Sequence, residues 1–338
     1  ILNKKLIIIS FLIPFFLNGE SIWVKYGNQV FRGVGDAKSI ALSESEIASA
    51  TGPLSVLYNP SLLNNSDIKK IVYSHQERFS GTVVFDVFGI DLIKKNDQNF
   101  SLAIIRESVQ GIPNTNDALL SNSLSFDDLN QRVLASKVTF FNQSQLATII
   151  GFSKIFFKSS LGANIKILNH NIGNFNGWGI GFDLGSTYNL SKNNKVGFSI
   201  NDVTTSWIVW DSGTVERILP EIRLGYSNNS KLQKYFIQIN SMFSTNFKLS
   251  GKELTDDFAI NNYGFELRAG FEFIFKEKLK IRFGRNPING RSIGVGTKIK
   301  FMDLDYAYIP SPNGTILGNS HYISFNIALD DLSKLFLN

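Results

Sequence analysis

The chain of 338 residues carries a net charge of +6, and 43% of its residues are hydrophobic, 13% aromatic and 18% charged. It contains no cysteine, which excludes a disulfide framework, a thiolate metal site and a lipid-anchored cysteine. A mean hydropathy of +0.00 is too low for a bundle of membrane helices. The small, dispersed excess of basic residues does not indicate nucleic-acid binding. These properties favour short alternating strands joined by polar turns.

The first segment has the pattern of an export signal. Lys4 and Lys5 precede an apolar stretch over residues 6–17, and Gly19 or Ser21 offers a small residue for cleavage. We therefore expect residues 1–21 to be a signal peptide. A retained anchor is the alternative, but the stretch is short and broken by Pro14.

Residues 22–66 form a second segment, which is rich in Gly, Ala and Ser and lacks strong alternation. Gly52 and Pro53 could start a helical turn that Asn59 and Pro60 would end. A segment of this size before the first strand could fold into the lumen of a barrel. We expect an N-terminal hatch, with an ordered periplasmic extension as the alternative.

Residues 67–330 show the repeated pattern of membrane-spanning strands. Between Trp178 and Tyr188, large apolar residues alternate with Gly and Asp. These two aromatic residues are ten positions apart on one face, so they would lie about 25 Å apart along the membrane normal. That is the height of a lipid-facing band between two aromatic girdles. Residues 331–338 would form a periplasmic tail.

The predicted fold class is all-β: a transmembrane antiparallel barrel of about fourteen strands with the hatch in its lumen. The connections are expected to alternate in length, with short periplasmic turns and longer outward loops at 108–144, 206–218, 246–261 and 310–318. The stretch 108–144 could instead hold a strand or an extracellular subdomain. The expected strands are 70–78, 81–91, 99–107, 145–156, 160–170, 177–190, 195–205, 219–228, 233–245, 262–275, 278–286, 291–301, 303–309 and 319–329.

Three segments resemble the PorV/PorQ family, which is related to the FadL-type (OmpP1/FadL/TodX) outer-membrane transport proteins. They are the hatch motif with Gly33, Asp36 and Ala37, followed by Tyr58, Asn59 and Pro60; the segment 219–226; and residues 305–324 near the end. Ser61 stands where the family usually has Ala. The resemblance implies a fourteen-stranded barrel with a lumenal hatch, in the outer membrane of a Gram-negative bacterium. It also implies one of two roles, movement of hydrophobic small molecules or binding of exported proteins in a secretion system.

Charged residues recur on the predicted lumen face of the later strands, because charge facing lipid is costly. We expect them to form a structural ion network that holds the hatch, with a polar ligand path as the alternative. The predicted network contains Asp183, Glu266, Arg268, Glu272, Lys280, Arg282, Lys298, Lys300, Asp303 and Asp305.

Three tryptophans are expected at the rim: Trp178, Trp207 and Trp210. They would be interfacial girdle residues, or they could capture an apolar ligand or a partner. The histidines His75, His170 and His321 have no neighbours at metal-ligand spacing, and no nucleophile elbow or nucleotide-binding motif occurs. We therefore expect no enzymatic activity, metal or cofactor.

The chain is thus predicted to be a monomeric barrel in contact with outer-membrane lipid. Transport of a small hydrophobic ligand is the preferred function. A secretion-associated component that binds exported proteins is the alternative, and nothing in the residues separates the two.

Overall fold

The computed structural model describes residues 21–23, 29–95, 97–120, 131–288, 290–311 and 317–331. Nearly all of the predicted signal peptide and C-terminal tail therefore lies outside the described residues. Within the described ranges, no helix is long and apolar enough to span a membrane.

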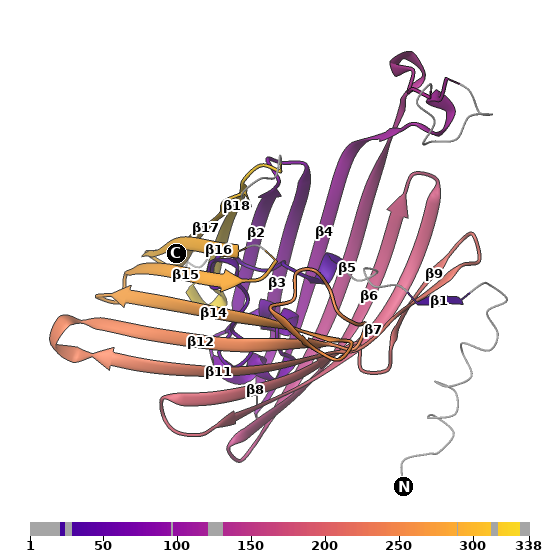
Figure 1. Cartoon of the computed structure of the whole chain (residues 1–338). Coiled ribbons are helices and arrows are strands. Elements are labelled where there is room, and N and C mark those ends of the chain that lie inside the picture. Colours follow the sequence, from indigo (N-terminus) through magenta and orange to yellow (C-terminus); the bar gives the residue numbers. More distant parts are fainter. Residues whose placement is uncertain are drawn as a thin grey trace, which may run out of the picture.

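An antiparallel barrel forms the body of the molecule (Figure 1). The described residues contain 18 strands, of which 14 close into a ring. The ring closes where β18 (Ser320–Ala328) pairs with β2 (Lys70–Arg78). The other ring strands are β3 (Val83–Lys95), β4 (Gln98–Asn114), β5 (Thr139–Phe156), β6 (Ser159–Ile172), β7 (Phe175–Asn189), β8 (Asn194–Asn201), β11 (Glu221–Leu232), β12 (Ile237–Lys248), β14 (Tyr263–Phe275), β15 (Leu279–Asn286), β16 (Gly290–Ile299) and β17 (Met302–Ile309).

The predicted fold class is confirmed, and each predicted strand overlaps one strand of the ring. Strict alternation explains this success, because one strand face meets the lumen and the other faces outward. On β7, Trp178 and Leu184 are exposed on the outer side, whereas Gly181 and Asp183 between them are buried in the lumen.

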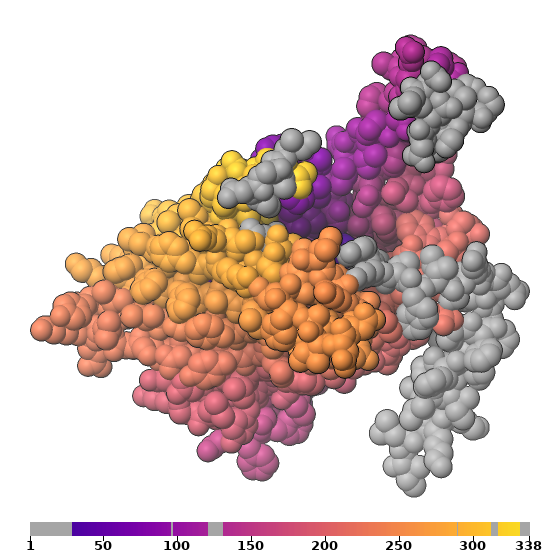
Figure 2. Space-filling model, in the orientation of Figure 1, coloured from indigo at the N-terminus to yellow at the C-terminus, as the bar shows by residue number. Residues whose placement is uncertain are grey.

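Residues 108–144 were predicted to be an outward loop, with a strand or a subdomain as the alternative. In the structure, both ends of this stretch extend strands of the wall. β4 and β5 continue far beyond their neighbours as a paired ribbon, with a register shift between Val109 and Ile112. Two short 3₁₀ helices, η5 (Asn116–Ala118) and η6 (Ala135–Lys137), lie at its tip. Figures 1 and 2 show this hairpin standing clear of the rest of the barrel.

A second difference interrupts the wall after β8. The predicted strand 195–205 ends at Asn201, and Asp202 and Thr205 then take positive φ angles of 55° and 64°. The chain resumes as β9 (Ser206–Trp210), which pairs with both β7 and β10 (Val215–Ile218). The predicted loop 206–218 is therefore a hairpin that continues the wall. The two remaining short strands are β1 (Ser21–Trp23) and β13 (Phe258–Ile260).

Residues 29–66 lie inside the ring, as the hatch prediction required (Figure 1). They form η2 (Gln29–Phe31), the single-turn helix α2 (Ala37–Ala41), η3 (Pro53–Leu57) and η4 (Pro60–Asn65). Their apolar side chains, such as Leu62, pack with lumen-facing Val87 and Ile105 into one buried cluster. Burial of apolar surface therefore contributes to holding the hatch in place.

Candidate functional site

The first half of the predicted hatch motif starts helix α2 of the hatch. Asp36 caps α2 by accepting a hydrogen bond from the Ser39 backbone N–H at 2.8 Å. Ala37 follows it and donates its N–H to Ser324 Oγ on β18 at 3.1 Å. Gly33 has a φ of 63°, which an L residue rarely adopts, and its carbonyl accepts a hydrogen bond from Arg78. The motif thus shapes the hatch and also ties it to the closing strands.

The second half of the motif fastens the hatch to itself and to the opposite wall. Asn59 is fully buried and caps η4, accepting from the Ser61 N–H at 3.1 Å, while Pro60 takes the first position of that helix. The Asn59 amide donates to the carbonyls of Ile47 at 2.9 Å and Ser186 at 3.1 Å. Tyr58 donates to a hatch carbonyl, that of Val34, at 3.2 Å. These four side-chain hydrogen bonds give the buried polar groups protein partners in place of the water that they lose on folding.

Glycines on the inner wall let the hatch approach the strands. A Cβ added to Gly162 would lie 2.3 Å from the Ser61 backbone nitrogen, and one added to Gly197 would lie 2.2 Å from the Ile47 carbonyl oxygen. Seven further lumen-facing glycines would meet hatch atoms at 2.6 Å or less: Gly89, Gly151, Gly185, Gly225, Gly270, Gly284 and Gly294. The contact of these glycines with the hatch was not predicted from the sequence, although glycine recurs at alternate positions of successive strands.

The predicted ion network exists on β14, β15 and β17, and its centre is Arg282. This side chain is 1% exposed and bridges Glu272 at 2.8 Å and Asp305 at 2.6 Å. Lys280 pairs with Asp303 at 2.9 Å on the neighbouring layer. The acidic, basic, acidic order of adjacent strands therefore forms real ion pairs, as expected.

Two members of the predicted network stand apart from it. Lys298 and Lys300 are exposed at the end of β16 and in the turn that follows, and neither forms an ion pair with a described residue. Lys298 keeps the register of the inward-facing Ser292, Gly294 and Gly296 but lies at the exposed end of β16, and Lys300 lies in the turn beyond Ile299, so neither reaches a carboxylate of the network.

A chain of charges links an outward loop to the hatch through β12 and β14. Lys248 is 1% exposed and contacts Glu253 of the loop at 2.7 Å. It also pairs with Glu266, which accepts from Arg268 at 2.9 Å, and Arg268 in turn pairs with Glu44 of the hatch. Glu44 and Lys248 were absent from the predicted network. Glu44 is 224 positions away from Arg268, and no local pattern connects the two. Lys248 lies beyond the end of the predicted strand 233–245.

The same loop and β14 together supply three carboxylates at cation-binding distance, two from the loop and one from the strand. Glu253, Asp256 and Glu266 place oxygens within 4.8 Å of one another. The Lys248 ammonium lies among them, 3.4 Å from Asp256. This ammonium takes the place that a metal ion would need, so the cluster closes the loop onto the wall.

A third ion cluster lies beside the interruption after β8. Lys166 on β6 pairs with Asp183 at 2.7 Å and with Asp202 at 2.5 Å. The Lys166 ammonium also lies 5.1 Å from the ring of Phe31 on the hatch. Asp183 was predicted to face the lumen and is buried there, but the break after β8 that brings Asp202 close to it has no strong sequence signal.

The hatch carries one further internal pair. Lys38 and Glu46 lie 2.8 Å apart. Burial alone disfavours the charged form of Lys38, but Glu46 and Glu272 outweigh it and raise the pKa of Lys38 above its ordinary value. Lys38 therefore stays charged over the whole physiological range.

The three rim tryptophans divide between the two faces of the wall. Trp178 is 58% exposed on the outer side, as a girdle residue should be, and Trp207 lies opposite the outward Ile180. Trp210 instead turns inward, with its ring centroid 5.0 Å from that of His170. A Cβ on the lumen-facing Gly177 would touch it at 3.0 Å, so the girdle prediction was wrong for Trp210.

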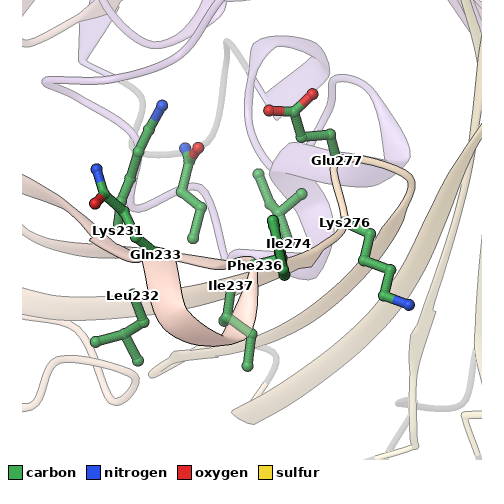
Figure 3. A pocket seen from close by; sticks show the side chains of 9 residues that line it. Lys231, Leu232, Gln233, Phe236, Ile237, Ile274, Lys276 and Glu277 are labelled. Atoms are coloured by element: carbon green, nitrogen blue, oxygen red, sulfur yellow. The ribbon is translucent and has the colours of Figure 1, made fainter.

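A cavity of about 710 Å³ opens at the end of the barrel where the short turns lie (Figure 3). It lies between the β11–β12 turn, with Leu232 and Phe236, and the β14–β15 turn, where the Lys276 N–H donates to the Phe236 carbonyl at 2.9 Å. Ile237 and Ile274 add apolar surface, and Lys231 stands at its edge. We call this space the rim cavity. It can accept an apolar group.

The fold and the plugged lumen define a class, a closed fourteen-stranded barrel with a hatch, and this fold is similar to that of solved toluene transporters and a hydrocarbon channel. The toluene transporter TodX of Pseudomonas putida has a TM-score of 0.58 and 13% identity over 87% of this chain and 98% of its own. For the toluene transporter TbuX of Ralstonia pickettii the TM-score is 0.54, with 12% identity, 87% of this chain and 98% of its own.

The monoaromatic hydrocarbon channel CymD is similar to the same degree, with a TM-score of 0.55 and 11% identity over 88% of this chain and 98% of its own. At such identities the likeness concerns the fold. No family model matches the sequence, and no curated protein matches it either.

Proposed function

We propose that the protein takes part in transport of small hydrophobic compounds across the outer membrane of a Gram-negative bacterium. The observation that carries the proposal is a lumen closed by a separate hatch, whose contacts with the wall include hydrogen bonds, ion pairs and apolar packing. Such a plug can shift without breaking the barrel. The rim cavity with Phe236 and Ile274 gives an apolar compound a place at the periplasmic end. The fold it shares with hydrocarbon transporters supports the proposal by analogy.

The test locks the hatch to the wall. The hydroxyls of Ser43 on the hatch and Ser292 on β16 lie 2.8 Å apart, so the double variant Ser43→Cys, Ser292→Cys places two thiols within reach of a disulfide. The chain has no cysteine of its own, so the cross-link is unique. Cells carrying the wild-type chain should take up labelled toluene faster than cells without it.

The oxidised double variant should lose that gain, and reductant should restore it. Each single cysteine variant is the matched control and should behave as wild type. Uptake that is the same with and without the chain would refute transport of this compound class, and uptake unaffected by the cross-link would refute a moving hatch.

A second candidate is a PorV-like component that binds exported proteins for surface attachment. The long β4–β5 hairpin favours it, because Leu120, Val133 and Phe140 are exposed there, Phe140 at 69%. If this role holds, replacing residues 115–138 by a tight turn should abolish co-elution of an exported protein and leave toluene uptake unchanged. Unchanged co-elution would refute the role of the hairpin.

A further inference from the structure

The outer wall carries a polar cluster where lipid-facing residues are expected. On β2, Ser74 and Gln76 are fully buried in the lumen, so the residues between and beside them, Tyr73, His75 and Glu77, face outward. The same argument places Asp86 on the outer face of β3 and Arg106 on that of β4, since their neighbours Phe85, Val87 and Ile105 are buried inside. We call Tyr73, His75, Glu77, Asp86 and Arg106 the outer polar cluster.

Contacts within the cluster join three strands. Asp86 is its centre: it accepts from the Tyr73 hydroxyl at 2.8 Å, and its carboxylate lies 2.9 Å from His75 Nδ1. The Arg106 guanidinium lies 3.9 Å from the other carboxylate oxygen. Glu77 lies 3.7 Å from His75 Nε2. Each of the five groups therefore has a polar neighbour, yet each keeps an exposed edge toward the outside.

The cluster continues onto the two strands on its other side. His321 on β18 pairs in register with Glu77. Its Nδ1 lies 2.7 Å from the Tyr306 hydroxyl on β17, and its ring centroid lies 5.3 Å from that of Tyr308. Tyr and Arg side chains, both present in this cluster, are enriched among the central residues of protein interfaces.

Strand length places the cluster inside the membrane-spanning part of the wall. β2 and β18 have nine residues each, and a spanning strand needs about 9–11. His75 is the sixth of these nine residues, so it lies within the length that β2 needs to span the membrane. β7 has no such break, because Trp178, Ile180, Phe182 and Leu184 follow one another on its outer face.

Direct contact with lipid would be unfavourable at this place. An outward basic residue costs about 2–4 kcal/mol at the midplane and less near the interfaces. We propose that the outer polar cluster is the docking face for another outer-membrane protein, a different chain whose lateral wall presents hydrogen-bond donors. This partner would satisfy the exposed edges of Asp86 and Glu77 and separate Arg106 from lipid.

The charges of the outer polar cluster favour a different protein over a lipid headgroup or a second copy of this chain. The cluster holds two carboxylates against one guanidinium, so it repels the phosphate of a lipid headgroup. Two copies of the chain meeting through this face would oppose like charges for the same reason. A wall with Arg, Lys, Ser or Asn donors is complementary to it.

Photo-cross-linking in intact outer membranes tests the proposal. The substitution Phe88→p-benzoylphenylalanine puts a probe beside Asp86 without removing a cluster residue, and Phe271→p-benzoylphenylalanine is the control on the far wall, with nearly equal exposure of 36% and 37%. Illumination should yield one discrete protein adduct from position 88 and none from position 271. Peptides of the adduct should identify a second β-barrel protein of that membrane.

The double variant Asp86→Leu, Arg106→Leu removes the polar groups and makes the wall apolar, so folding in lipid is favoured, and heat-modifiable gel migration verifies it. The adduct yield from position 88 should fall about tenfold, which corresponds to about 1.4 kcal/mol of binding. Four results would overturn the proposal: adducts with lipid alone, an adduct of twice the chain's own mass, an equal adduct from position 271, or a yield that the double variant leaves unchanged.

Discussion

Gly162 shows how a single missing side chain determines the fit between wall and plug. The backbone of Pro60 and Ser61 lies where its Cβ would be, at 2.3–2.4 Å. We expect Gly162→Val to push η4 off β6 and to lower the free energy of unfolding by about 1–3 kcal/mol through overpacking. Urea unfolding in detergent, followed by heat-modifiable migration, measures the loss.

The control for that change is the next residue. Ala163 belongs to the outer face of β6, between Leu161 and Ile165, so Ala163→Val adds the same kind of branch toward lipid. Its unfolding midpoint should stay within about 0.5 kcal/mol of wild type. Equal effects of the two variants would mean that the hatch does not press on the wall at Gly162.

Arg282 is the buried charge on which two carboxylates depend. Arg282→Gln leaves Glu272 and Asp305 without their partner in the lumen, and breaking a buried pair in this way costs about 3–5 kcal/mol. The thermal midpoint should fall clearly. The matched control is Lys298→Gln, an exposed position on the next strand, which should change stability by less than about 0.5 kcal/mol. A small effect at Arg282 would show that water or a movable side chain replaces its charge.

Sequence could predict Arg282 and its partners because they alternate on adjacent strands, and register brings them together. It could not predict that Glu44 pairs with Arg268. These two residues are 224 positions apart, and Glu44 lies in a turn with a φ of 57°, outside any periodic element. The contact depends on how the hatch enters the lumen, which no local pattern encodes.

Among the elements, the loop between β12 and β14 is held inward by one lysine. Lys248→Met removes the ammonium from among Glu253, Asp256 and Glu266, so the three carboxylates repel one another and the loop should leave the wall. Trypsin should then cut after Lys252 several-fold faster than in wild type. Lys300→Met, which removes an exposed lysine, should leave the cutting rate unchanged. A rate that Lys248→Met does not alter would show that other contacts hold the loop.

The elements were predictable to the extent that their faces differ. β14 alternates full charge with large apolar groups, and its bounds match the prediction within one residue. The β4–β5 ribbon was predicted poorly because beyond the membrane neither face meets lipid, and alternation fades. β8 was predicted to run to residue 205, and β9 was placed in the loop 206–218, because the break with positive φ at Asp202 leaves no mark in composition.

On the scale of the whole molecule, the two faces of the barrel wall meet different surroundings, lipid outside and the hatch inside, and they differ in chemistry for that reason. Lipid selects the apolar outer face, which explains why strand number could be predicted from the sequence alone. The inner face fits the hatch through glycines and paired charges, and the hatch sequence has no regular alternation of polar and apolar residues. Its presence could be predicted from its small residues, whereas its path required the structure.

The last prediction follows from that division. The lumen wall is polar, with Arg268, Arg282 and their carboxylates facing inward, so an empty lumen would fill with water and conduct ions. We expect the hatch to prevent this, because its side chains Leu42, Ile47 and Leu62 are at most 1% exposed inside the lumen. Wild-type protein in a planar lipid bilayer should therefore be silent, and deletion of residues 29–66 should produce steady conductance.

A point substitution tests the same prediction if the deletion variant does not insert into the bilayer. Glu44→Lys places like charges at the Arg268 contact, so the hatch should loosen on that side and give brief openings. The oxidised Ser43→Cys, Ser292→Cys chain should stay silent, since its hatch is tied to β16. Steady conductance from the wild type would mean that water already passes the hatch. The polar lumen would then be an open path in its own right, and the ion pairs along it would act on passing solutes rather than on the plug.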